Sequence, residues 1–258
     1  MVYQIAMLCF SFQLSSVHIP GFLPQPVTGN RNFNSKIYRG GESNQLLYLC
    51  HLQNVAIMKY INGGKLYRFF IDPLLNKMHR LMTSRISTGQ HVLDIACGNG
   101  TLALKMARRA GHVTAIDLSE ASIQYASERK KMNETGNIDF IQANATDIDI
   151  YEKIPFDSVV LSMAIHQFSS DDLRKILTYI SNYRAQLFVL DYASPMARSW
   201  KGFAANTIER AAGREHYNNY RVYQSEGGAK EILKNYGIEI EHVYISTNGV
   251  FQLVSGRS

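Results

Sequence analysis

The sequence contains few cysteines: Cys9, Cys50 and Cys97 among 258 residues, with no CxxC pair. An odd number of cysteines without regular spacing excludes a disulfide framework, and it does not predict a zinc cluster. We therefore expect no metal site and a reducing, cytoplasmic location.

Long hydrophobic runs are also absent. The apolar stretch over residues 3–14 is too short to span a bilayer, and no basic segment precedes it as in a signal peptide. We therefore predict no transmembrane segment. The composition, 46% hydrophobic and 19% charged, is typical of a folded globular chain and argues against disorder.

Positive charge is in excess but is not concentrated. The net charge is +6 and the pI is about 9.1, yet the basic residues are spread over helical segments instead of forming a block interleaved with aromatic residues. The clearest examples are Arg108, Arg109, Arg129, Lys130 and Lys131. We expect no nucleic-acid partner. Peripheral contact with an anionic membrane surface is compatible with this charge.

The first 57 residues differ in character from the rest. Residues 21–41 are rich in Pro, Asn and Gly and show no periodicity, which is typical of a poorly structured segment. Two interpretations compete: a real N-terminal extension, or upstream sequence that is not translated, with Met58 as the true start. We favour the second, and we assign residues 58–258 to a single domain.

From residue 65 onward, helical and strand-like patterns alternate. The predicted strands are 91–96, 112–116, 138–141, 156–161, 186–190, 238–245 and 250–254. The predicted helices are 65–85, 101–110, 119–132, 169–180, 199–212 and 224–236. Such alternation predicts an α/β fold with a mostly parallel sheet and helices on both faces. Asn248-Gly249 predicts a final antiparallel hairpin.

A glycine-containing turn follows the first predicted strand. Gly98 and Gly100 lie between that strand and a helix, where glycine lets the backbone approach a ligand closely. The pattern alone fits both a dinucleotide and an adenosyl sulfonium. Asp94 at the strand end favours the sulfonium, because a carboxylate would repel a pyrophosphate and attract an ammonium or sulfonium centre. Asp117, at the end of the next strand, suits ribose hydroxyls in either case.

At these positions the sequence resembles the class I S-adenosylmethionine-dependent methyltransferases, in particular their small-molecule branch. The resemblance covers about residue 66 to the C-terminus. The matching segments are 92–101, 115–119, 140–147, 156–162 and the final hairpin. It implies a seven-stranded sheet in the order 3-2-1-4-5-7-6, with S-adenosylmethionine as the cofactor.

The resemblance also implies roles for individual residues. Asp94 and the backbone of Ala96, Cys97, Gly98 and Gly100 would hold the methionine end of the cofactor. Asp117 would bind the ribose, Leu118 and Ala145 would lie at the adenine, Ser162 would lie beside the methionyl part, and Tyr67 would close over the cofactor.

Two positions depart from the family pattern. Asn144 replaces the usual Asp that binds the adenine amino group, and we expect its amide oxygen to accept that bond instead. Ala96 replaces a glycine, a change that is tolerable if its φ angle stays negative.

Two absences narrow the acceptor to a small molecule. The fourth predicted strand ends in Ser162-Met163-Ala164-Ile165, which is unlike the Asn/Asp-Pro-Pro-Tyr/Phe motif of amino-methylating nucleic-acid enzymes. No cysteine near it could serve as the nucleophile of a C5-pyrimidine methylase. In-line methyl transfer mainly needs a positioned acceptor and, where that acceptor is protonated, a base.

We expect residues 58–85 and 192–225 to cover the acceptor side of the domain. Within the second segment, residues 213–221 are unusually polar and aromatic. His166, His216 and Tyr217 are our candidates for a catalytic base or an acceptor-orienting group, weighed against ordinary structural roles for all three.

Three further hypotheses stay open. A quinone or prenyl-lipid acceptor is the alternative within methyl transfer. An NAD-dependent oxidoreductase and a non-catalytic partner subunit with the methyltransferase fold are the alternatives outside it. The sequence does not indicate the oligomeric state.

Overall fold

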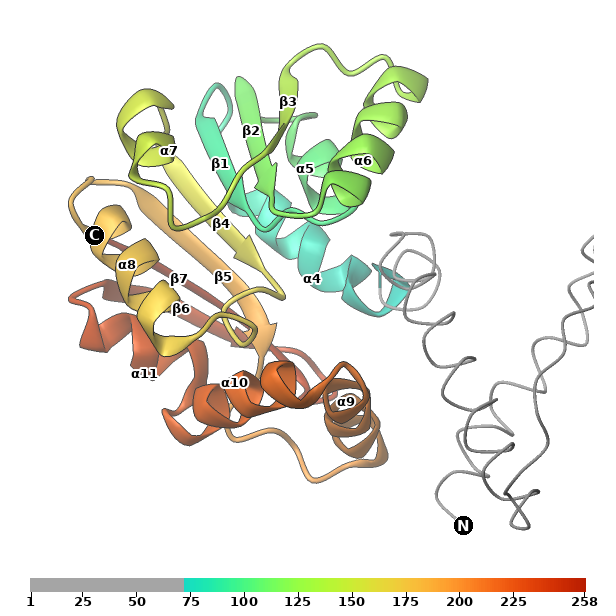
Figure 1. Cartoon of the computed structure of the whole chain (residues 1–258), viewed down its shortest axis with the longest axis vertical. Coiled ribbons are helices and arrows are strands. Elements are labelled where there is room, and N and C mark those ends of the chain that lie inside the picture. The colour runs from blue at the N-terminus through green and yellow to red at the C-terminus, as the bar shows by residue number, and fades with distance from the viewer. Residues whose placement is uncertain (1–71) are drawn as a thin grey trace, which may run out of the picture. The chain divides into compact units, whose positions relative to one another are not determined.

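The computed structural model describes residues 72–258 (Figure 1). Tyr67, the first 57 residues and the part of the predicted acceptor cover before residue 72 lie outside the described residues, so those predictions remain untested.

Seven strands form one sheet in the order β3-β2-β1-β4-β5-β7-β6, as predicted. The strands are β1 (His91–Ile95), β2 (His112–Asp117), β3 (Ile138–Gln142), β4 (Ser158–Ser162), β5 (Gln186–Tyr192), β6 (Glu239–Ile245) and β7 (Phe251–Arg257). The first five are parallel, and β7 runs antiparallel to both β5 and β6. The carboxyl ends of β1, β2, β4 and β5 therefore share one edge.

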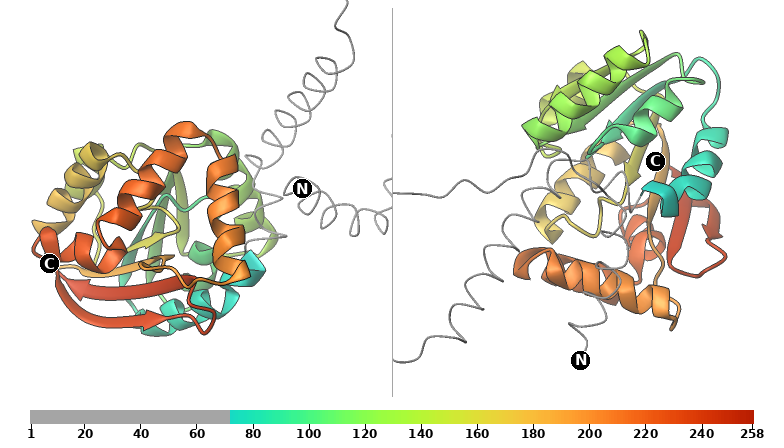
Figure 2. Two further views of the ribbon diagram at one scale, coloured as in Figure 1. Left: turned by 90° about the horizontal axis from the view of Figure 1, so that it is seen from below. Right: turned by 90° about the vertical axis from the view of Figure 1, so that its right-hand side faces the viewer.

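Helices pack on both faces of the sheet (Figures 1 and 2). They are α4 (Asp72–Arg85), α5 (Thr101–Met106), α6 (Glu120–Met132), α7 (Ile148–Lys153), α8 (Ser170–Ser181), α9 (Trp200–Ala211), α10 (Arg214–Ser225) and α11 (Gly228–Asn235). Central strand residues such as Leu93, Val160 and Val189 are fully buried, so the core follows the apolar runs of the parallel strands.

Local sequence signals explain several boundaries. The Ser119 and Ser169 side chains accept hydrogen bonds from the backbone N–H groups of Ser122 and Asp172, and they cap α6 and α8 as N-cap serines do. Asn248 and Gly249 lie in the turn between β6 and β7, where Gly249 has a φ of +67°.

Three segments differ from the prediction. The predicted helix 224–236 is two helices: α10 ends at Ser225 and α11 begins at Gly228, because Gly227 and Gly228 both have positive φ angles and break the chain direction. The polar, aromatic stretch after Gly213 forms most of α10, a helix that was not predicted. The short helix α7 was not predicted. Among the helices of residues 72–258, none is long and apolar enough to cross a membrane.

Candidate functional site

The loop between β1 and α5, residues 96–100, is here called the cofactor loop. Gly98 and Gly100 have φ angles of +53° and +71°. A Cβ added to Gly98 would meet no atom within 4 Å, whereas one added to Gly100 would lie 2.6 Å from the Phe140 ring. Gly98 is therefore open to a ligand, and Gly100 is required by packing inside the protein.

Ala96 does not meet the condition expected from the sequence. Its φ is +56°, in the left-handed region, so the expectation of a negative angle was wrong. The backbone at Ala96 keeps the conformation that a glycine would adopt. This conformation is strained for alanine, because its Cβ lies too close to the following carbonyl oxygen.

Asp94 is the strongest electrostatic feature of this edge. Its side chain is 1% exposed, and neither carboxylate oxygen has a hydrogen-bond partner among residues 72–258. Burial, and then the nearby Asp117 carboxylate, raise the pKa of Asp94 to about 8. A buried carboxylate without partners is costly, and a bound cation would relieve that cost. The ammonium and sulfonium of S-adenosylmethionine supply such a cation, so these residues fit the cofactor.

Asp117 closes the second strand beside the cofactor loop. One of its oxygens accepts a bond from the Gly98 N–H at 2.7 Å, and the other accepts one from the Ser119 N–H at 2.8 Å. Each oxygen keeps a second lone pair, so bonding to ribose hydroxyls remains compatible with these contacts. Next to it, Leu118 is 69% exposed, which suits a side chain that packs on an adenine ring.

The other predicted cofactor residues lie along the same edge. Asn144 is exposed, and its amide oxygen accepts bonds from both the backbone N–H and the hydroxyl of Thr146 at 3.0 Å. These bonds occupy the lone pairs that we expected the adenine amino group to use. Ala145 is buried, Ser162 is half-buried at the end of β4, and Cys97 is half-buried with a pKa raised by burial and by Asp94 and Asp117.

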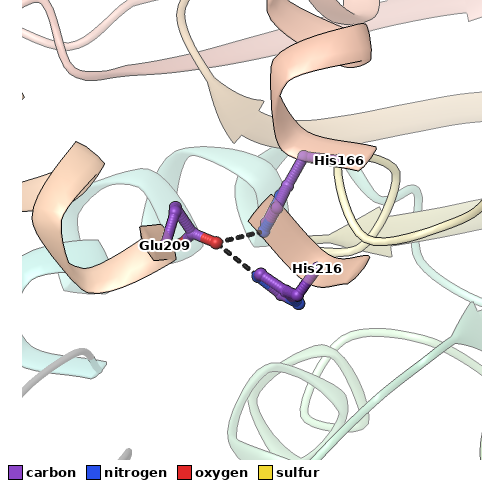
Figure 3. A group of neighbouring side chains, drawn as sticks. All are labelled: His166, Glu209 and His216. Atoms are coloured by element: carbon purple, nitrogen blue, oxygen red, sulfur yellow. Dashed lines mark hydrogen bonds and ion pairs between the residues drawn. The ribbon is translucent and has the colours of Figure 1, made fainter. Parts of the chain in front are cut away.

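A second group of ionisable side chains lies beyond the ends of β4 and β5. His166 follows β4, Asp191 belongs to β5, Glu209 to α9 and His216 to α10; we call these four residues the His–acid cluster. The His166 Nδ1 atom lies 2.6 Å from Asp191 Oδ1, and its Nε2 atom lies 3.6 Å from Glu209 Oε2. The same Glu209 oxygen contacts His216 Nε2 (Figure 3).

The His–acid cluster is deeply buried. His166, Asp191 and Glu209 are 1%, 0% and 5% exposed, and only His216 is half-buried. Burial lowers the pKa of His166, but the Asp191 and Glu209 carboxylates outweigh burial and raise it overall. Burial raises the pKa of Glu209, but contacts with His216, His166 and Tyr192 outweigh this effect and lower it. The cluster therefore stabilises positive charge at its centre.

Of the predicted catalytic candidates, the structure brings His166 and His216 together and leaves Tyr217 apart. Tyr217 stacks on Tyr220 and lies under the Arg210 guanidinium. Sequence reasoning missed Glu209. The available signal was its spacing with Gly202 and Ala205, because these three residues form the buried face of α9 while the aromatic residues point outward.

A pocket lies between the linker after β5 and the cap helices α9 and α10. Its volume is about 1020 Å³. Its lining contains four aromatic side chains and two arginines, namely Trp200, Phe203, Tyr217, Tyr220, Arg198 and Arg221. These four aromatic residues all belong to the segment 192–225 that was predicted to cover the acceptor side.

Comparison with known proteins agrees with this geometry. Residues 92–187 match a family model described as a methyltransferase domain. The chain therefore contains a methyltransferase domain, and its sheet has the fold of the class I S-adenosylmethionine-dependent methyltransferases. S-adenosylmethionine is accordingly its cofactor, and the sheet order is that of the methyltransferase fold.

Individual relatives are distant. The methyltransferase is 24% identical over 227 residues to the ubiquinone/menaquinone biosynthesis C-methyltransferase UbiE of Escherichia coli, covering 81% of this chain and 89% of UbiE. Among solved structures, an O-methyltransferase family protein from Burkholderia thailandensis has a TM-score of 0.55 at 17% identity, covering 79% of this chain and 59% of that one. Magnesium protoporphyrin IX methyltransferase from Synechocystis PCC 6803, solved with S-adenosylhomocysteine, has a TM-score of 0.50 at 16% identity, covering 72% and 82%.

Proposed function

We propose that this methyltransferase transfers a methyl group to a small, ring-containing molecule held between the ends of β4 and β5 and the cap helices α9 and α10. The observation that carries the proposal is the position of the His–acid cluster. It places two imidazoles, of the buried His166 and the half-buried His216, beyond the carboxyl ends of β4 and β5, and β4 pairs with β1, which leads into the cofactor loop.

At the donor end, the cofactor supplies an electrophilic methyl group on a cationic sulfur. Asp94 offers an unpaired carboxylate to the cationic end of the cofactor, and the Gly98 backbone leaves space for it. Asp117 and Leu118 would hold the ribose and the adenine. Arg129 holds the cofactor loop in place, because it donates hydrogen bonds to the Asn99 carbonyl and to the Thr101 hydroxyl at the start of α5. Such fixed positioning is what an in-line displacement needs.

At the acceptor end, the pocket between α9 and α10 combines flat aromatic walls with arginines. Trp200, Phe203 and Tyr220 suit a ring, and Arg221 suits an acidic or phenolic oxygen on it. His166 and His216 are the groups that would take up or hold a proton of the acceptor, with Asp191 orienting His166 through Nδ1. Tyr217, which lines the same pocket, would orient the ring.

A quinone precursor is the acceptor class that we favour within this proposal. The relative UbiE is described as a quinone-biosynthesis C-methyltransferase and aligns over most of both chains. A phenolic ring is activated for methylation at carbon when its hydroxyl loses a proton, a task that suits the buried imidazoles. We retain the cytoplasm as the predicted compartment, on the basis of cysteine usage.

The donor end is tested by calorimetry with S-adenosylhomocysteine on the full chain. We expect binding to the wild type and no measurable heat with Asp94→Ala. His242→Ala changes an exposed residue of β6 and is the matched control. Heat with NAD in place of S-adenosylhomocysteine would favour the oxidoreductase alternative and contradict the proposal.

The acceptor end is tested by transfer of a tritiated methyl group from S-adenosylmethionine to a panel of small phenols, hydroquinones and short-chain prenylated hydroquinones. We expect a prenylated or simple hydroquinone to be labelled, and His166→Ala to lower kcat at least 100-fold. If the cofactor bound but no acceptor were labelled, the result would contradict the proposed enzyme and favour the alternative that the protein is a non-catalytic partner subunit.

A further inference from the structure

The His–acid cluster contains two buried carboxylates that need a positive counter-charge. Among residues 72–258, the ion pairs of Asp191 and Glu209 are with His166 and His216 only; no lysine or arginine takes part. Two buried negative charges are costly unless cations lie close to them. The counter-charge is therefore either protons on the imidazoles or a cation bound between the side chains.

The orientation of His166 favours a bound cation. Its Nδ1 donates to Asp191 at 2.6 Å, so in the neutral ring Nε2 carries a lone pair. That lone pair faces the Glu209 Oε2 atom at 3.6 Å, which is too long for a hydrogen bond. Two ligand atoms that each lie about 2.0–2.2 Å from one tetrahedral ion are about 3.4 Å apart, close to the observed separation.

His216 completes a set of three donor atoms. The ligand atoms of His166, Glu209 and His216 all lie within 4.8 Å of one another, and they converge from the loop after β4 and from α9 and α10 (Figure 3). His216 contacts Glu209 directly, and its side chain is 25% exposed. An ion between these two atoms therefore requires the partly exposed His216 ring to rotate away from the carboxylate.

A supporting layer holds these ligands in place. Asp191 binds the second nitrogen of His166, and the Tyr192 hydroxyl donates to the second oxygen of Glu209 at 2.6 Å. Carboxylates and hydroxyls in these positions orient metal ligands in proteins. Helix α9 also turns Glu209 inward while Trp200 is 76% exposed, the reverse of an ordinary amphipathic helix.

We propose that His166, Glu209 and His216 bind one divalent transition-metal ion with Zn²⁺-like ligand preference, leaving an open coordination position towards the methyl acceptor. Two imidazoles and one carboxylate are a known ligand set for such ions. With the ion bound, the ring nitrogens of His166 and His216 would be ligands and not bases, so the ion, in place of the imidazoles, would polarise an acceptor hydroxyl and its proton would pass to solvent. This last role rests on the proposed function, whereas metal binding itself does not.

The experiment uses Co²⁺ as a spectroscopic probe on the full-length, tag-free, metal-depleted chain. We expect visible ligand-field absorption that saturates at one equivalent and disappears when Zn²⁺ is added. His216→Ala removes a half-exposed ligand, and we expect it to weaken Co²⁺ binding at least 100-fold. Asp191→Asn keeps all three ligands, and we expect a 10- to 100-fold loss. His242→Ala is the control and should bind like the wild type.

Circular dichroism and S-adenosylhomocysteine calorimetry on each variant separate lost metal binding from lost folding. Normal cofactor binding with no Co²⁺ spectrum in the wild type would overturn the metal site and leave the proposed function intact. Equal Co²⁺ affinity in the wild type and His216→Ala would also overturn it, since the ion would then lie elsewhere. A normal Co²⁺ spectrum without any labelled acceptor would support the metal site and contradict the proposed acceptor chemistry.

Discussion

Ala96 is a single residue at which sequence and backbone disagree. Its φ of +56° costs a residue with a Cβ about 1–2 kcal/mol, whereas glycine adopts this angle freely. Ala96→Gly also loosens the unfolded chain, which offsets about 0.4–1 kcal/mol. We expect a net rise of up to about 1.6 kcal/mol in the free energy of unfolding, measured by urea denaturation.

The same substitution at an ordinary helical position gives the matched control. Ala121 is exposed in the first turns of α6, where glycine is expected to lower the free energy of unfolding by about 0.5–1 kcal/mol. Equal losses in the two variants would show that Ala96 is not strained. The sequence alone did not reveal this strain. It shows that alanine replaces a glycine at position 96, but it does not show whether the φ angle there is positive.

At the scale of elements, local patterns predicted the strands well and the region after β5 poorly. Buried parallel strands such as β4 appear in the sequence as short apolar runs, which predict a strand directly. Asn248-Gly249 predicts a hairpin turn from two residues alone. Helix α10 has no such signature, because most of its residues are polar or aromatic and only Tyr220 and Tyr223 are buried. Its position depends on contacts with distant elements, which a single sequence does not display.

Tyr223 is the main connection between α10 and its neighbours. Its buried hydroxyl donates to the Tyr192 carbonyl of β5 at 2.5 Å and accepts bonds from the Ala229 N–H of α11 and the Gln252 side chain of β7. Tyr223→Phe leaves the Ala229 N–H unpaired in the first turn of α11, whose N-cap is a glycine. We expect a loss of about 1–3 kcal/mol in the free energy of unfolding.

Thermal or urea denaturation of Tyr223→Phe measures this loss. Tyr244→Phe on β6 removes a hydroxyl from a tyrosine that is 36% exposed, and it should change the free energy of unfolding by less than about 0.5 kcal/mol. Indistinguishable stabilities for these two variants would mean that the Tyr223 hydroxyl does not hold α10 to the sheet.

At the scale of the whole molecule, the two ends of the site were not equally predictable. The donor end is built from one short motif and two neighbouring strand ends, so the sequence alone offers Asp94, Gly98 and Asp117 as candidates, and the structure brings them to one edge of the sheet. The His–acid cluster takes its four residues from four different segments, spread over residues 166–216. Its key residue, Glu209, looks like an ordinary surface acid until α9 is packed against β5 and α10.

Asp94 links this architecture to the stability of the whole chain as a function of pH. Its pKa is about 8 in the folded protein and about 3.8 when exposed in the unfolded chain. The unfolded state therefore releases its proton first as pH rises. The stability that Asp94 contributes is complete below pH 4, falls as pH rises from about 4 to 8, and is lost above pH 8.

We isolate this contribution by comparing the wild type with Asp94→Asn, whose side chain does not titrate, in urea denaturation between pH 5 and 8 without cofactor. The free energy of unfolding of the wild type relative to Asp94→Asn should fall with rising pH, by at most about 1.4 kcal/mol per pH unit. S-adenosylhomocysteine keeps an ammonium, so bound ligand should hold Asp94 ionised and flatten this slope in the wild type. If the difference in free energy of unfolding between the wild type and Asp94→Asn stayed constant from pH 5 to 8, the raised pKa of Asp94 would be contradicted. The argument that this carboxylate is stabilised by a bound cation would then fail as well.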